Sequence, residues 1–63
     1  MTIYRLLELL TDNLRGFKIC YDHFTGFIVL SNRRNTTIFE GSIEDLTEDI
    51  VETELLPTLM EVD

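Results

Sequence analysis

The stretch FKICYDHFTGFIVLSNRRNTTIFE, residues 17–40, decides the fold, because it contains three strand patterns separated by two turns. Apolar and polar side chains alternate in residues 17–22, as in a half-buried strand. Residues 27–31 are apolar on both faces, which indicates a central strand whose second face is partly covered. Residues 36–40 are rich in β-branched and aromatic residues and predict a third strand. In the first turn, Gly26 can adopt a positive φ.

A helix is predicted before this sheet, over residues 2–13. Its apolar side chains recur at helical spacing and form one stripe for packing: Ile3, Leu6, Leu7, Leu10 and Leu14. Thr2 is a candidate N-cap, and Asn13 and Gly16 are typical of a helix end.

A short acidic helix is predicted after the sheet, within residues 43–54. Its two candidate starts are the Ser42-x-x-Asp45 box and Thr47. Because the residue before a proline avoids helical geometry, Pro57 predicts that this helix ends by about residue 53.

The last segment, residues 55–62, is predicted to be a C-terminal edge strand, and a short helix beginning at Pro57 is the alternative. Together these elements predict one α+β domain over residues 1–63, with the helices on one face of a small antiparallel sheet.

Two parts of the chain resemble a group of short uncharacterised proteins of phages and mobile elements of Gram-positive bacteria. They are LLELL at residues 6–10 and IFEGSIEDLTEDIVETELLPTLMEV at residues 38–62. That group has an N-terminal helix, a strand ending in Gly, an Asp-Leu-Pro-Glu helix start and a closing strand. The matching residues here are Phe39, Gly41, Asp45, Leu46 and Glu48. Thr47 stands where proline is usual. Because the shared motifs are structural rather than catalytic, the resemblance implies fold and genomic setting but carries over no active site.

The composition indicates in which cellular compartment the protein is expected. Cys20 is the only cysteine, which fits a reducing environment. The sequence shows no secretory leader pattern, and its longest apolar run, residues 27–30, is too short to span a membrane. We therefore expect a cytoplasmic protein without a membrane partner.

Charge is distributed unevenly. Residues 1–39 contain five basic and three acidic side chains, whereas residues 40–63 contain nine acidic side chains and no basic one, which gives the net charge of −7. In a continuous helix over residues 43–54, Glu44, Asp45, Glu48, Asp49 and Glu52 would lie within an arc of about 140°. A helix needed only for solubility usually carries charges of both signs.

This pattern predicts a non-enzymatic protein-binding module. Its partner would be the basic surface of a host nuclease or another nucleic-acid-binding protein, which it would inhibit by mimicking nucleic acid, as anti-CRISPR and anti-restriction proteins do. The predicted partner-binding residues are Glu40, Glu44, Asp45, Glu48, Asp49, Glu52 and Glu54. An ordinary solvated acidic helix face remains the alternative interpretation of the same residues.

A second hypothesis is a self-associating structural or assembly protein, a homodimer, because the sheet offers an edge strand and a strand that is apolar on both faces. An enzyme using Cys20 and His23 ranks last, because Cys20 and Asp22 share a strand face that His23 leaves. One cysteine and one histidine cannot form a closed zinc site, so no metal or cofactor is expected. Arg33 and Arg34 form a basic turn, but the acidic half opposes direct nucleic-acid binding.

Overall fold

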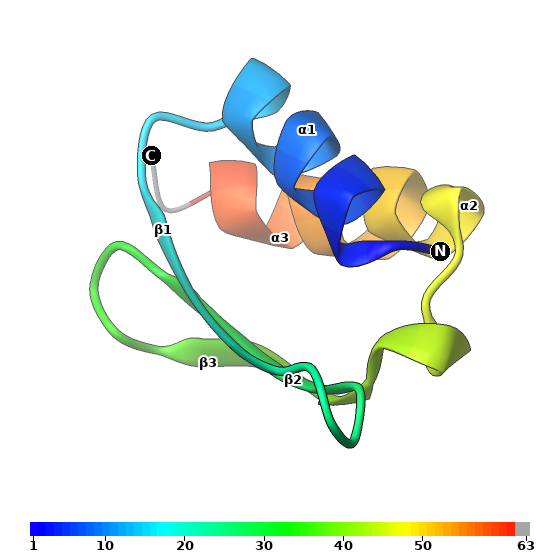
Figure 1. Ribbon diagram of the computed structural model, residues 1–63. Coiled ribbons are helices and arrows are strands. Elements are labelled where there is room, and N and C mark those ends of the chain that lie inside the picture. Colours follow the sequence, from blue (N-terminus) through cyan, green and yellow to red (C-terminus); the bar gives the residue numbers. More distant parts are fainter. Residues whose placement is uncertain (62–63) are drawn as a thin grey trace.

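The computed structural model describes residues 1–61 and confirms the predicted α+β architecture. In chain order the elements are α1 (Ile3–Asn13), β1 (Phe17–Asp22), β2 (Phe27–Asn32), β3 (Thr37–Ser42), the 3₁₀ turn η1 (Ile43–Asp45), α2 (Glu48–Ile50), the π-helical turn η2 (Val51–Leu55) and α3 (Leu56–Met60). The last three elements form one continuous helix. Figure 1 shows that this helix and α1 lie on the same face of the sheet.

The sheet is antiparallel with the order β1-β2-β3, so the prediction of a central second strand is confirmed. Ile19 lies opposite Leu30, which in turn lies opposite Phe39, and these three side chains therefore share the face beneath the helices. Between β2 and β3 the register shifts next to Leu30. The shift leaves Ile38 as an extra residue, and both Ile38 and Phe39 pack against the core.

A backbone hydrogen bond closes the first turn of the sheet, and a side chain holds the second. Gly26 adopts a φ of 76°, as predicted, and its N–H donates to the carbonyl oxygen of Asp22 at 2.7 Å. In the second turn, Oδ1 of the buried Asn32 accepts from the N–H groups of Arg34 and Thr36 at 2.8 and 3.0 Å. Satisfying Asn32 in this way lets a polar residue occupy the face that packs on the helices.

The first helix begins and ends where the sequence predicts. Oγ1 of Thr2 accepts a hydrogen bond from the N–H of Arg5, and the side-chain amide of Asn13 donates to the carbonyl of Leu9. The buried core joins one side of α1, the inner face of β2, η1 and the C-terminal helix. Its most deeply buried side chains are Leu6, Leu10, Ile28, Leu30, Leu46, Val51 and Leu59.

The predicted C-terminal strand is wrong, because the chain is helical from Glu48 to Met60. Val51, Leu55 and Leu59 recur every four residues and are 0, 6 and 2% exposed. Burying this stripe against the sheet and α1 outweighs the local preference for an extended residue before proline. The alternative prediction, a short helix beginning at Pro57, is closer to the structure. The observed segment is not a separate helix, because it continues the helix that begins at Glu48. Val62, the end of the predicted strand, lies outside the described residues.

A wider helical turn accommodates Pro57. A proline within an α-helix lacks an N–H donor, and its ring collides with the carbonyl group four residues earlier. In η2 the N–H of Leu56 donates to the carbonyl of Val51, five residues earlier, which widens the turn just before the proline. Leu56 consequently keeps helical dihedral angles, with φ −60° and ψ −46°, despite preceding a proline.

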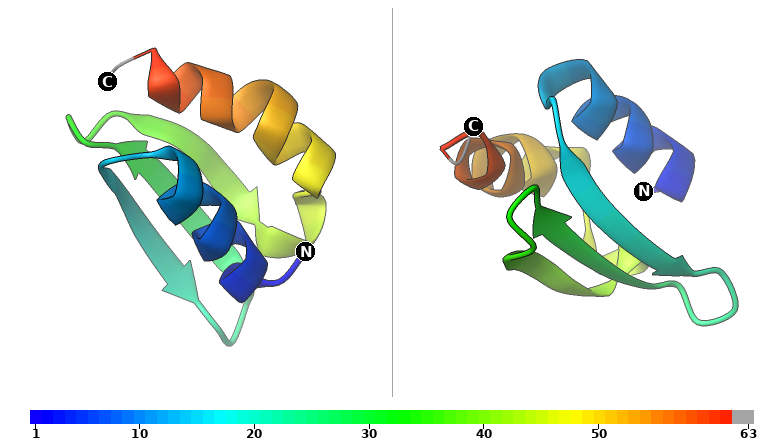
Figure 2. Two further views of the ribbon diagram at one scale, coloured as in Figure 1. Left: turned by 90° about the horizontal axis from the view of Figure 1, so that it is seen from above. Right: turned by 90° about the vertical axis from the view of Figure 1, so that its left-hand side faces the viewer.

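The outer face of the sheet points away from both helices (Figure 2). On this face Val29 is half-buried between Cys20 and Glu40, which lie opposite it on the two neighbouring strands. Phe27 is 44% exposed there, and Phe24 in the adjoining turn is 87% exposed. The second face of β2 is thus partly covered, as its apolar sequence predicts.

The burial of Leu59 gives a direct test of the helical C-terminal segment. We expect Leu59→Ala to lower the free energy of unfolding by about 2–5 kcal/mol, because it removes a large side chain from a closed core. The matched control is Met60→Ala, since the Met60 side chain is 54% exposed. Urea unfolding followed by circular dichroism measures both. Equal effects of the two substitutions would contradict the burial of Leu59 and the packing of the C-terminal helix on the core.

Candidate acidic interaction surface

All seven predicted partner-binding side chains are exposed. Six of them follow one another along η1, α2 and η2, and we call these six the acidic surface: Glu44, Asp45, Glu48, Asp49, Glu52 and Glu54. Glu40 is separate from them. It lies opposite Val29 on the outer face of the sheet, which points away from the helices.

The acidic surface is not one continuous helix, so the predicted arc over residues 43–54 is wrong in its geometry. The chain turns once in η1 and becomes extended at Leu46 and Thr47, with ψ of 139° and 160°, before the helix starts at Glu48. Leu46 is 1% exposed, and its insertion into the core keeps the two helical segments apart. Glu44 and Asp45 therefore lie on η1, and Asp49 and Glu52 lie on the helix that follows.

Both predicted helix starts exist, and each begins its own segment. Oγ of Ser42 accepts from the N–H of Glu44 at the start of η1. Oγ1 of Thr47 accepts from the N–H of Ile50 and caps the C-terminal helix. Acidic side chains occupy the first turn of both segments, where the partial positive charge of a helix N-terminus is most favourable to them.

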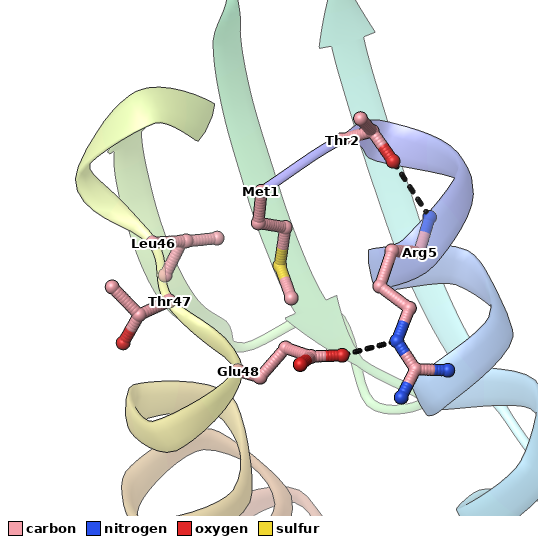
Figure 3. Close-up of a pocket in the computed structure, with 6 residues that line it drawn as sticks. All are labelled: Met1, Thr2, Arg5, Leu46, Thr47 and Glu48. Carbon is pink, nitrogen blue, oxygen red and sulfur yellow. Dashed lines mark hydrogen bonds and ion pairs between the residues drawn. The ribbon is translucent and has the colours of Figure 1, made fainter.

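One member of the acidic surface is already paired. Figure 3 shows Glu48 pointing toward Arg5 of α1, and the Arg5 Nε–H donates to Oε1 of Glu48. Nη1 of Arg5 also contacts Oε1 of Glu8 at 2.5 Å. The hydrogen bond to Glu48 raises the pKa of Arg5 above its ordinary value, so the guanidinium stays charged between the two carboxylates.

The remaining carboxylates have no such partner. Within residues 1–61, the structure places no basic side chain in an ion pair with Glu44, Asp45, Asp49, Glu52 or Glu54. Sequence reasoning did not find the contact between Arg5 and Glu48, because the two residues are 43 positions apart and no local pattern joins them. Among the described residues, the unpaired carboxylates of the acidic surface thus lie on both sides of Glu48 in the chain.

A shallow, open hollow of about 530 Å³ lies next to this ion pair, between the start of α1 and the start of α2. Its lining residues are Met1, Thr2, Arg5, Leu46, Thr47 and Glu48 (Figure 3). The Met1 side chain projects into the space between the two helix starts. The hollow offers apolar surface beside an exposed ion pair.

The other residues considered from the sequence lie in the sheet. Cys20 is exposed on the outer face of β1, while the His23 ring lies in the adjoining turn against Phe24, with 4.2 Å between ring centroids. Arg33 and Arg34 are exposed in the turn between β2 and β3. Among the described residues, no group of three or more His, Cys, Asp or Glu side chains is arranged to hold a metal ion.

No helix in the described part of the chain is both long and apolar enough to cross a membrane. Comparisons with protein-family models, curated proteins and solved structures found no match to this chain.

Capping by Thr47 tests the break in the acidic surface. We expect Thr47→Ala to lower the free energy of unfolding by about 0.5–2 kcal/mol, because the N–H of Ile50 loses its acceptor. Thr47→Ser retains a hydroxyl and is the matched control. If one helix ran through residues 43–54, alanine would instead stabilise the chain through its higher helix propensity. Thermal unfolding of the three proteins distinguishes these arrangements.

The pairing of Glu48 with Arg5 predicts that the acidic residues differ in their effect on stability. At low salt, Glu48→Gln should lower the melting temperature slightly, since it removes the attraction to Arg5. Glu52→Gln removes an unpaired charge and should not lower it. Both differences should fade at about 1 M salt, where charges on the surface are screened. A decrease for Glu48→Gln that persists at high salt would contradict the electrostatic origin.

Proposed function

We propose that this protein is a non-enzymatic binding module whose acidic surface docks on the basic surface of a nucleic-acid-binding protein. The observation that supports the proposal is the exposure of the carboxylates of η1, α2 and η2, all of which except Glu48 lack a basic partner among residues 1–61. Repulsion between neighbouring carboxylates would be relieved when a basic surface approaches. Binding would therefore be stabilised by electrostatic attraction that the isolated module does not have.

The arrangement suits a surface that normally holds a nucleic-acid backbone. Glu48 and Glu52 are four residues apart on the helix and therefore about 6 Å apart along its axis, whereas the phosphates of one nucleic-acid strand recur about every 3.4 Å along the duplex axis. Lysine and arginine side chains on a partner are long enough to adapt to this difference. The proposed mechanism is occupancy, in which the module blocks the site by contact and changes no covalent bond.

The partner class in this proposal is a host nuclease or a related nucleic-acid-binding protein, and the setting is a phage or mobile element in a bacterial cytoplasm. The resemblance of residues 6–10 and 38–62 to short phage and mobile-element proteins supports that setting. An inhibitor of the anti-CRISPR or anti-restriction type would need only a small, strongly charged surface, which this chain has. Glu40 lies on another face and is not required for the proposed contact.

The competing hypothesis is a self-associating assembly protein, and one of the two sequence features that supported it is absent from the described structure. Residues 55–60 are helical, so they offer no edge strand for pairing between copies. The remaining observation is the sheet itself, whose outer face and edge β1 are exposed.

Charge reversal on the acidic surface tests the proposal. The variant Asp49→Lys/Glu52→Lys should weaken binding to a susceptible Cas or restriction nuclease by at least about tenfold, because two attractive contacts become repulsive. These two residues are preferred to Glu48, whose reversal would also break the pairing with Arg5. Biolayer interferometry against a panel of such nucleases measures the affinity, and circular dichroism confirms that the variant is folded.

The matched control is Asp12→Lys, which changes an exposed acidic residue of α1 outside the acidic surface. It should reduce affinity far less than the double reversal. Binding of the unmodified protein should also weaken between about 150 and 500 mM salt. Absence of binding to every nuclease, or binding that neither salt nor the double reversal affects, would contradict the proposed function.

A further inference from the structure

The two edges of the sheet differ in how well they are protected from pairing with another strand. The edge strand β3 contains a register shift at Ile38 and a glycine at position 41, and both disturb a regular ladder. The other edge strand, β1, pairs with β2 in unbroken register from Phe17 to Asp22. It contains no proline, glycine or bulge, so its free side can accept a further strand.

Charges on β1 determine which strand fits there. Lys18, Cys20 and Asp22 lie on the outer face, and all three are exposed. Lysine on an edge strand normally discourages pairing. A second copy of β1 running antiparallel, with Cys20 opposite Cys20, would place Lys18 of each copy opposite Asp22 of the other. The strand is therefore complementary in charge to itself.

We propose that this protein forms a two-fold symmetric dimer through antiparallel pairing of β1 with β1 of a second copy, centred on Cys20. The two three-stranded sheets would then join into one continuous sheet. Such a contact is isologous, because each copy presents the same strand. This dimer is independent of the proposed binding function, since β1 contains no residue of the acidic surface.

Other antiparallel registers leave the charges unmatched. Centring the pair on Lys18 or Asp22 places like charges opposite each other, which destabilises a cross-strand pair. Centring it on Ile19 or Tyr21 gives neither charge an oppositely charged neighbour directly across. A slip by a single residue would turn the helices of the second copy to the other side of the sheet. The register centred on Cys20 is thus favoured by the strand's own sequence.

The side chains on the inner face of β1 and the separation of the two acidic surfaces also favour this register. Ile19 of one copy would lie opposite Tyr21 of the other, and this pairing would cover Tyr21, which is 38% exposed in the single chain. The C-terminal helix lies over the β3 side of the sheet, and α1 lies over the β1 side (Figure 2). Pairing through β1 therefore keeps the two acidic helices at the far ends of the dimer.

Sedimentation equilibrium from about 1 to 100 µM protein tests the dimer. The expected result is a mass that rises from the 7.4 kDa monomer toward twice that value. Lys18→Asp should raise the dissociation constant by at least about tenfold, because each altered strand then carries like charges opposite each other. Glu40→Lys, on the outer face of β3, changes a charge away from the contact and should leave association unchanged.

A mixing experiment separates this register from any other contact. Lys18→Asp makes β1 acidic at both positions, and Asp22→Lys makes it basic at both. Each variant should be monomeric alone, and an equimolar mixture should form a one-to-one dimer with all four charges matched. Asp22→Lys also removes the acceptor for the Phe24 N–H, so circular dichroism must first show that this variant folds. Lys18→Glu, which keeps Asp22 as the acceptor in the turn, is a second variant that should be monomeric, because it places like charges opposite each other.

Oxidation of Cys20 provides a positional measurement. Residues directly opposite in an antiparallel pair have Cα atoms about 4.5–5.5 Å apart, a separation that a disulfide can bridge. With copper phenanthroline and oxygen as the oxidant, two Cys20 thiols should lose two protons and two electrons and form a disulfide-linked dimer. Cys20→Ser/Thr37→Cys moves the thiol to β3 and should cross-link much less. A monomer at all concentrations, or association unaffected by the charge variants and the thiol position, would overturn the proposal.

Discussion

The fold depends on one apolar layer that two helices and one face of a three-stranded sheet bury together. Leu6 and Leu10 of α1 meet Ile28 and Leu30 of β2 in this layer, and all four side chains are fully buried. A chain of 63 residues buries only about 60% of the surface that it exposes when unfolded, so little stability is held in reserve. Every other feature must be compatible with this single layer.

The need to complete the layer explains where local sequence rules succeeded and where they failed. Residues 17–40 carry both strand alternation and turn residues, so local pattern was enough to predict the sheet. Around Pro57, local preference and burial disagree, and burial of Leu55, Leu56 and Leu59 prevails by means of a widened helical turn. The four-residue spacing of the buried side chains is visible in the sequence, but the preference of a residue before proline for an extended conformation points to the opposite interpretation.

In the candidate site, too, some features follow from local sequence and others only from tertiary packing. The exposure of the acidic residues could be predicted, because burying an unpaired ionised carboxylate in the core is costly. The break in the helix at Leu46 could not be predicted, because Ser42 and Thr47 are both good caps. Only the packing of Leu46 in the core shows that both caps are used. The pairing of Arg5 with Glu48 depends on how α1 crosses the helix start, which is a property of the tertiary fold.

These features give the molecule two separate exposed regions with different charge. The acidic surface follows β3 in the chain and carries unpaired negative charge, whereas the free edge of β1 carries one charge of each sign. A surface of one sign favours a partner of the other sign, and a strand with both signs favours its own copy. In a dimer through β1, two acidic surfaces would be available to partners at once, which would increase the apparent affinity for a partner that has two basic sites.

We propose that the acidic surface occupies a site that nucleic acid would otherwise fill, and a competition experiment measures this occupancy. A nuclease that binds the protein is titrated with a fluorescent duplex at fixed concentrations of the protein, and anisotropy reports the bound duplex. Mutually exclusive binding is expected, in which the apparent dissociation constant of the duplex rises linearly with the protein concentration. Formation of a ternary complex, with duplex affinity unchanged at saturating protein, would contradict it.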